Sequence, residues 1–267
     1  MANPKRERQK QGRQLRQEYL RQQQRRAARR RLIVAGVLVA AVVIGVSFLF
    51  SRGGKKKTNV SSKETTTTAA STSTTAVPAA YGTTPCPPGD GSAPRTTTFK
   101  DSFVKCIDPA KKYTATVQTD AGTMTIVLAA DQSPVTVNNF VALARYHFYD
   151  GVVCHRVIKG FVDQCGDPKG DGTGGPGFTI GEEPPASGKY AIGQLAMAKT
   201  GAPHSTGSQF FIIVGDQGAG LPPQYSYLGT ITAGLDAAKH IEADGADADP
   251  APPKVVHKLV KVSVAES

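Results

Sequence analysis

The sequence predicts a mainly β protein, a closed antiparallel barrel with helices outside it, preceded by a single transmembrane helix and a disordered stalk. Three observations favour this architecture. Residues 32–50 form an uncharged apolar run, residues 51–84 are rich in Thr, Ser and Ala, and the chain from Cys86 onward alternates apolar and polar residues in many short segments. About 180 residues follow the stalk, enough to bury one core.

Basic residues are concentrated in the tail that precedes the apolar run. Residues 1–31 hold twelve Lys and Arg against two Asp and Glu, which is +10 of the formal net charge of +11. The remaining residues hold twenty against nineteen and are nearly neutral. This asymmetry indicates a cytoplasmic tail that meets an anionic surface. A nucleic-acid interface is disfavoured, because Tyr19 is the only aromatic residue of the tail.

The run LIVAGVLVAAVVIGVSFLF, residues 32–50, is long enough as a helix to cross a hydrocarbon core of about 30 Å. It is apolar on every face, which disfavours a globular helix. A cleaved signal peptide is an alternative, but the preceding segment is long and no A-x-A-like site follows. We predict an uncleaved anchor in the cell membrane, with the N-terminus in the cytoplasm and the remainder outside. Arg52 and residues 55–57 oppose this orientation but are outnumbered.

The segment 51–84 has no apolar periodicity and is predicted to be a flexible stalk. Residues 85–112 are predicted to be a segment tethered by a disulfide, and residues 113–267 the folded domain. All the cysteines lie after the apolar run: Cys86, Cys106, Cys154 and Cys165. An even count in an oxidising compartment predicts two disulfides.

Alternation and turn residues predict the elements of the domain in order. Residues 113–119 and 123–129 alternate around the turn 120–122 and form a hairpin. Ser133 and Pro134 are typical of an N-cap and a first helical residue, and 134–146 is an amphipathic helix. Further strands are expected at 193–198, 208–214, 227–232 and 254–264, with a short helix at 234–242.

The stretch CHRVIKGFVDQCGD, residues 154–167, is predicted to be a hairpin with a two-residue turn at Lys159 and Gly160. In that register Cys154 faces Cys165 and His155 faces Gln164. Opposed Cβ atoms lie about 4.5–5.5 Å apart, close to disulfide geometry. We therefore predict this disulfide, with two free buried thiols as the alternative. The remaining cysteines, Cys86 and Cys106, would then pair.

A metal or nucleotide site is disfavoured in this region. Cys154 and His155 are neighbours on one strand and point to opposite faces, so they cannot easily share a zinc ion. Asp163, Asp167 and Asp171 lack the spacing of a calcium loop. The Gly/Pro-rich loop 166–189 has no phosphate-loop ending and no strand-to-helix frame. No metal or cofactor is expected.

Arg156 lies within the apolar first strand of this hairpin, and Arg is rarely buried without a partner. The pattern alone fits a structural arginine as well as a functional one. The longer motif decides between them by resemblance. HRVIKGFVDQCGDP and GQLAMAKTGAPHSTGSQFFIIVGD resemble the two signatures of the cyclophilin family of peptidyl-prolyl cis-trans isomerases, and SPVTVNNFVALARYHFYDG resembles its first helix. The resemblance covers about residues 113–264.

The resemblance implies an eight-stranded antiparallel barrel capped by two helices, with an active groove on its outer surface. Arg156 corresponds to the catalytic arginine of the family. The residues implied to line the proline pocket and groove are Phe161, Val162, Gln164, Gln209, Phe211, Leu221 and Tyr225. The family uses no metal or organic cofactor, and the implied partners are X-Pro segments of unfolded or exported proteins, bound by a monomer.

The sequence also departs from the family pattern. Cys154 replaces the usual Phe before His-Arg, Tyr225 stands where His is common, and 199–204 is one residue longer than the commonest form. That extra residue leaves a backbone contact unassigned between Lys199 and Thr200. The chain contains no Trp, which puts cyclosporin sensitivity in doubt rather than catalysis.

The predicted function is isomerisation of X-Pro amides in exported or surface proteins, assisting their folding. Rotation about the amide breaks its resonance, and a guanidinium donor stabilises the twisted form more than the planar one. One alternative is a module or chaperone that binds proline peptides on the same fold without turnover. Another is a surface scaffold whose interactions lie in the stalk or tail.

Overall fold

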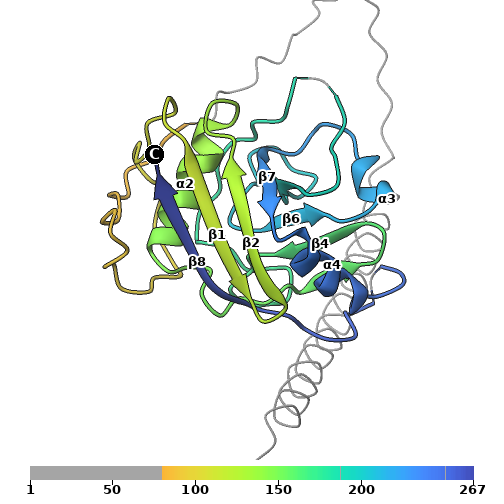
Figure 1. The fold of residues 1–267 in the computed structure, drawn as a ribbon. Helices are drawn as coiled ribbons and strands as arrows, with labels where there is room; N and C mark the ends of the chain where they lie inside the picture. The colour runs from red at the N-terminus through yellow and green to blue at the C-terminus, as the bar shows by residue number, and fades with distance from the viewer. Residues whose placement is uncertain (1–79, 187, 250) are drawn as a thin grey trace, which may run out of the picture. The chain divides into compact units, whose positions relative to one another are not determined.

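The computed structural model describes residues 80–186, 188–249 and 251–267; the predicted tail, the apolar run and nearly all of the stalk lie outside them. Eight antiparallel strands form one sheet in the order β3-β4-β6-β5-β7-β2-β1-β8 (Figure 1). Their bounds are β1 Tyr113–Thr119, β2 Gly122–Leu128, β3 Arg156–Ile158, β4 Val162–Cys165, β5 Gln194–Met197, β6 Phe210–Ile213, β7 Tyr227–Ala233 and β8 Leu259–Glu266. No helix in these ranges is long and apolar enough to span a bilayer.

The end strands of the sheet, β3 and β8, are joined by a short connection rather than by a full strand ladder. Val153 and Lys258 form an isolated bridge, and the Cys154 N–H donates to the His257 carbonyl over 2.9 Å. The predicted closed barrel is therefore a half-barrel whose open side is spanned by these few residues. A continuous ladder between β3 and β8 is not formed because β3 is short, with three residues.

Three helices accompany the sheet in the described ranges: α2 Pro134–Arg145, α3 Asp216–Ala219 and α4 Leu235–Ala243. The sequence predicts α2 and α4 but not the single turn of α3. The predicted side-chain cap from Ser133 is absent. Instead, the carboxylate of Glu183 accepts the N–H groups of Val135 and Thr136 over 3.1 and 2.7 Å. The cap of this helix is therefore supplied by the loop 166–189 and not by Ser133, the residue next to it in the sequence.

The predicted two-residue turn of the β3–β4 hairpin is wrong. Arg156 pairs with Gln164 and Ile158 with Val162, so residues 159–161 form a three-residue loop. Gly160 has φ +72°, a left-handed conformation that glycine adopts freely and that three-residue hairpin loops require. The shift of one residue replaces the expected His155–Gln164 pair and places Arg156 directly beside Gln164.

Both predicted disulfides are present. Cys154–Cys165 and Cys86–Cys106 join Cα atoms 4.0 and 5.4 Å apart. The second fastens the segment before β1, where Phe99 and Phe103 pack against Tyr146 and Phe178. Residues 82–84, which the composition assigned to the end of the stalk, pair with 102–104 instead. This segment is thus built onto α2 and the loop 166–189.

The last strand begins later than predicted, at Leu259 rather than residue 254, because the chain before it turns inward. His257 is 6% exposed and lies between two carboxylates, 3.0 Å from Asp120 and 3.1 Å from Asp244. Burial alone would lower the pKa of His257, but the hydrogen bonds to both carboxylates outweigh it and raise the pKa above 6.5.

The raised pKa of His257 predicts a pH-dependent stability. The protonated ring binds Asp120 and Asp244 better than a neutral ring does, so its contribution is complete below about pH 6.5 and is lost as pH rises through the raised pKa. We expect His257→Gln to lower the free energy of unfolding at pH 6 by about 1–2 kcal/mol and to lower it less at pH 9. Urea unfolding at both pH values measures this, and an equal loss at each would contradict it.

Candidate active site

A row of paired residues on three adjacent strands builds the floor of the site. Arg156 on β3 pairs with Gln164 on β4, and Gln164 pairs with Phe211 on β6. Because side chains alternate along a strand, Val162 shares the face of Gln164, while Asp163 and Cys165 point to the other side. Short strands in this register therefore place a cation, an amide and an aromatic ring side by side.

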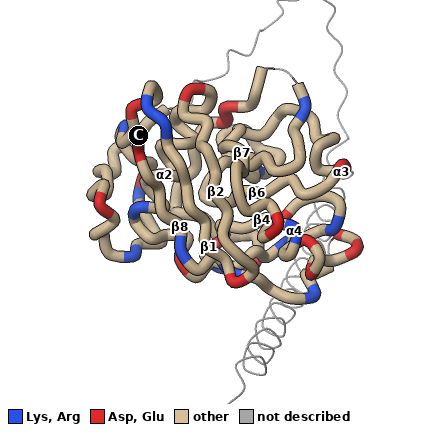
Figure 2. The backbone as a smooth tube through the Cα atoms, in the orientation of Figure 1, with Lys and Arg blue, Asp and Glu red and all other residues tan. Residues whose placement is uncertain are grey.

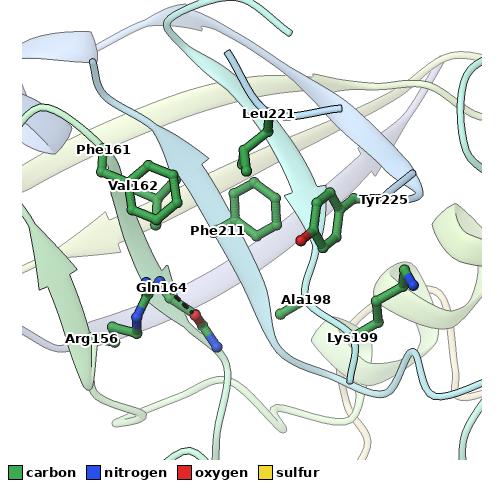
Figure 3. A pocket seen from close by; sticks show the side chains of 9 residues that line it. All are labelled: Arg156, Phe161, Val162, Gln164, Ala198, Lys199, Phe211, Leu221 and Tyr225. Atoms are coloured by element: carbon green, nitrogen blue, oxygen red, sulfur yellow. Dashed lines mark hydrogen bonds between the residues drawn. The ribbon is translucent and has the colours of Figure 1, made fainter. Parts of the chain in front are cut away.

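These residues border a pocket of about 220 Å³ (Figure 3). Its lining residues come from the β3–β4 hairpin, from the end of β5, from β6 and from the loop between α3 and β7. They are Arg156, Phe161, Val162, Gln164, Ala198, Lys199, Phe211, Leu221 and Tyr225. Apart from Arg156, Gln164 and Lys199, the lining is apolar or aromatic.

The apolar side of the pocket is a hydrophobic cluster of its own, separate from the main core. The rings of Phe211 and Tyr225 meet edge to face with centroids 5.3 Å apart. The Tyr190 hydroxyl fixes the Tyr225 loop, since it donates to the Tyr225 carbonyl over 2.7 Å and accepts the Tyr225 N–H over 3.1 Å. A rigid apolar wall of this kind suits a small ring and excludes water from it.

Arg156 stands at the rim of the pocket with its side chain 28% exposed. Its Nη1 donates to Gln164 Oε1 over 3.3 Å, and its guanidinium lies 5.3 Å from the centre of the Phe161 ring. Gln164 Nε2 in turn donates to Gln209 Oε1 over 2.9 Å, and Gln209 Nε2 to the Gly174 carbonyl over 2.9 Å. The arginine is therefore neither buried nor free, and a chain of side-chain amides supports it.

The structure brings together nearly all the residues that the resemblance implied. Arg156 and six others line the pocket: Phe161, Val162, Gln164, Phe211, Leu221 and Tyr225. Gln209 lies instead in an adjoining hollow of about 770 Å³, which shares Gln164, Ala198 and Lys199 with the pocket.

The sequence predictions did not include Ala198 or Tyr190, and named Lys199 only as one of two positions for a backbone contact. Ala198 and Lys199 line the pocket, and Tyr190 supports it. The predicted strand 193–198 could have indicated Ala198, because Ala196 and Ala198 would share one face of such a strand. In the part of the chain that the structure describes, no group of three or more His, Cys, Asp or Glu is arranged to hold a metal.

A half-barrel of eight strands with an arginine at the edge of an outer apolar pocket defines a cyclophilin-like domain. Residues 114–264 match the family model of cyclophilin type peptidyl-prolyl cis-trans isomerase/CLD. The chain belongs to this family.

Several curated relatives are similar to the chain. A probable peptidyl-prolyl cis-trans isomerase B of Mycobacterium tuberculosis is 43% identical over 141 residues, covering 47% of this chain and 44% of the relative. The protein of the same name from Mycobacterium leprae is 39% identical over 173 residues, covering 57% of each. The chain thus spans about half the length of these relatives. Peptidyl-prolyl cis-trans isomerase B of Bacillus subtilis is 42% identical over 123 residues, covering 46% of this chain and 85% of the relative.

Solved structures agree with this assignment. A cyclophilin type peptidyl-prolyl cis-trans isomerase of Cryptosporidium parvum superposes with a TM-score of 0.53 and 27% identity, covering 58% of this chain and 99% of the other. The same protein solved in the presence of the dipeptide Ala-Pro gives a TM-score of 0.52 and 28% identity over the same shares of the two chains.

Proposed function

We propose that this chain catalyses cis–trans isomerisation of X-Pro peptide bonds, with Arg156 as its catalytic residue. The observation that carries the proposal is the guanidinium held by Gln164 at the edge of a rigid apolar pocket. The chemistry of the arrangement fits a substrate with one small apolar ring next to a polar amide. A proline residue has this form.

The chemistry needs no covalent step. The barrier to rotation of a peptide bond is about 18–20 kcal/mol, because rotation ends the conjugation between nitrogen and carbonyl. In the twisted amide the proline nitrogen becomes pyramidal and gains a lone pair. A guanidinium N–H near that nitrogen stabilises the twisted state more than the planar one, which is the condition for catalysis. An arginine suits the task because its guanidinium is a planar cation with a fixed array of donors.

The other residues of the pocket would hold the parts of the substrate around the amide. Val162, Phe211 and Leu221 would hold the pyrrolidine ring, and Phe161 would close the pocket beside the guanidinium. The adjoining hollow lined by Gln209 would take residues that flank the proline. The Cryptosporidium parvum protein solved with Ala-Pro supports a proline-containing ligand for this fold.

A protease-coupled assay on a short X-Pro peptide tests the proposal with the full chain. We expect the cis fraction to convert much faster than the uncatalysed time of tens to hundreds of seconds. Phe211→Ala should raise KM, since it removes one of the aromatic walls of the pocket. A rate equal to the uncatalysed one would overturn the proposal. Peptide binding without any acceleration of isomerisation would indicate a binding module without turnover.

We also propose that residues 32–50 anchor the chain in the membrane, with the isomerase domain on the outer side as a monomer acting on exported proteins. The uncharged run of nineteen residues supports an anchor. The disulfides Cys86–Cys106 and Cys154–Cys165 support an oxidising, extracytoplasmic setting.

Fractionation tests this location. The chain should stay in the membrane pellet after alkaline carbonate washing, and external protease should remove the isomerase domain from cells with a permeable outer layer. Recovery in the soluble fraction would contradict the anchor, and protection from protease would contradict the orientation.

A further inference from the structure

Besides Gln164, a residue outside the pocket binds the guanidinium of Arg156. This residue is Asp249, in the connection between α4 and β8. Its two carboxylate oxygens accept hydrogen bonds from Arg156, one from Nε over 3.2 Å and one from Nη2 over 2.8 Å. This is the two-point geometry in which Arg–carboxylate pairs are strongest. Asp249 does not line the pocket, and 93 residues separate it from Arg156 along the chain.

We propose that Asp249 is a positioning residue for Arg156, a role that rests on the proposed isomerase function. A guanidinium has five N–H donors in one plane. Asp249 accepts the N–H of Nε and one N–H of Nη2, and Gln164 accepts one N–H of Nη1. One donor on each Nη atom is left for a substrate, and the plane of the group is fixed by contacts on two of its edges.

The segment that carries Asp249 is itself anchored beside β3. The Ala246 N–H donates to the Val157 carbonyl over 2.9 Å, and the Lys159 N–H donates to the Ala246 carbonyl over 3.0 Å. Asp247 lies 3.3 Å from Lys159 Nζ and 3.1 Å from Lys254 Nζ. Charged residues of both signs are visible along this segment next to α4 (Figure 2). The carboxylate is therefore presented by a backbone paired to the same strand that carries Arg156.

We expect the ion pair between Arg156 and Asp249 to affect the orientation of Arg156 more than the stability of the fold. The side chains of Arg156 and Asp249 are 28% and 50% exposed, and a pair so exposed adds little to the stability of a fold. Its effect falls on the orientation of a long side chain, which is otherwise held by a 3.3 Å contact to Gln164. Small errors in the placement of a catalytic group cost rate, so the contact should be visible in kcat.

The experiment compares wild type, Asp249→Ala and Asp249→Asn in the isomerisation assay. We expect Asp249→Ala to lower kcat by about three- to tenfold with KM within about twofold. Asp249→Asn should fall between them, because its amide oxygen can accept one guanidinium donor while its NH₂ cannot accept the other. Asp236→Asn is the matched control, since Asp236 is an exposed acid on α4 that does not line the pocket, and should leave kcat unchanged.

Two further readouts separate positioning from a general structural effect. In an Arg156→Lys background, which cannot form the two-point contact, Asp249→Ala should change kcat less than about twofold. The Arg156 Nε–H resonance should exchange faster with solvent in Asp249→Ala than in wild type or Asp236→Asn. An unchanged or higher kcat in Asp249→Ala, or an equal loss in the Lys background, would overturn the proposal. Should wild type show no turnover, the proposed function fails, and the Nε–H resonance still tests the contact.

Discussion

Replacing Arg156 with Ala is expected to lower kcat/KM for an X-Pro peptide by about 100- to 1,000-fold, the usual cost of removing one preorganised donor from a transition state. The apolar walls of the pocket remain in this variant, so peptide binding should weaken far less than turnover. Steady-state kinetics together with a peptide titration measure the two effects separately.

The stability of the variant is the necessary check on this result. Arg156 stands at the rim with its side chain 28% exposed, so its removal should leave the fold intact by circular dichroism. Arg95→Ala is a matched control, because Arg95 is also exposed and donates to a backbone carbonyl, that of Asp150, outside the pocket. A loss below about threefold in Arg156→Ala, or an equal loss in Arg95→Ala, would count against a catalytic arginine.

Removing the disulfide Cys154–Cys165 by a double substitution to Ala is expected to reduce both stability and turnover. The bond joins residues 11 apart in the chain, and constraining a loop of that size stabilises a fold by about 2–3 kcal/mol. Both half-cystines are fully buried, so truncation also loses packing. Because Gln164 precedes Cys165 and Arg156 follows Cys154 by two residues, loosening the hairpin should also lower kcat.

The other disulfide provides the comparison. Cys86→Ala with Cys106→Ala opens a bond between residues 20 apart, which should cost stability by a similar amount. That bond fastens the segment before β1 and touches none of the pocket residues. Urea unfolding and kcat measured on both double variants should therefore show two losses of stability and one loss of turnover. Equal kcat losses would mean that the hairpin disulfide has no special part in holding Arg156.

Much of the fold could be predicted because its signals are local. The alternation in 113–119 and 123–129 and the helical spacing after Pro134 locate β1, β2 and α2 to within a residue or two. The hairpin register could not be predicted in the same way. A positive φ at Gly160, here +72°, fits a two-residue turn as well as a three-residue loop, so this glycine alone does not signal that Gln164 pairs with Arg156.

The site was less accessible to pattern reasoning than the strands that carry it. Alternation left the role of Arg156 open, and its assignment came from the resemblance of two long motifs. Contacts between distant segments gave no local signal. The Glu183 cap of α2, the Tyr190 clamp on Tyr225 and the Asp249 contact each join residues more than 30 apart in the chain. Such pairs depend on how the loops pack, which no short stretch of sequence encodes.

Exchange spectroscopy on a proline peptide tests the central claim most directly. The full chain is added at a small fraction of the peptide concentration, and the rates between cis and trans resonances are measured at equilibrium. We predict that both rates rise by the same factor, that the cis-to-trans ratio is unchanged, and that Arg156→Ala reduces the acceleration by about 100- to 1,000-fold. Peptide resonances that shift on addition of the protein while exchange stays at tens to hundreds of seconds would show binding without catalysis and contradict the account.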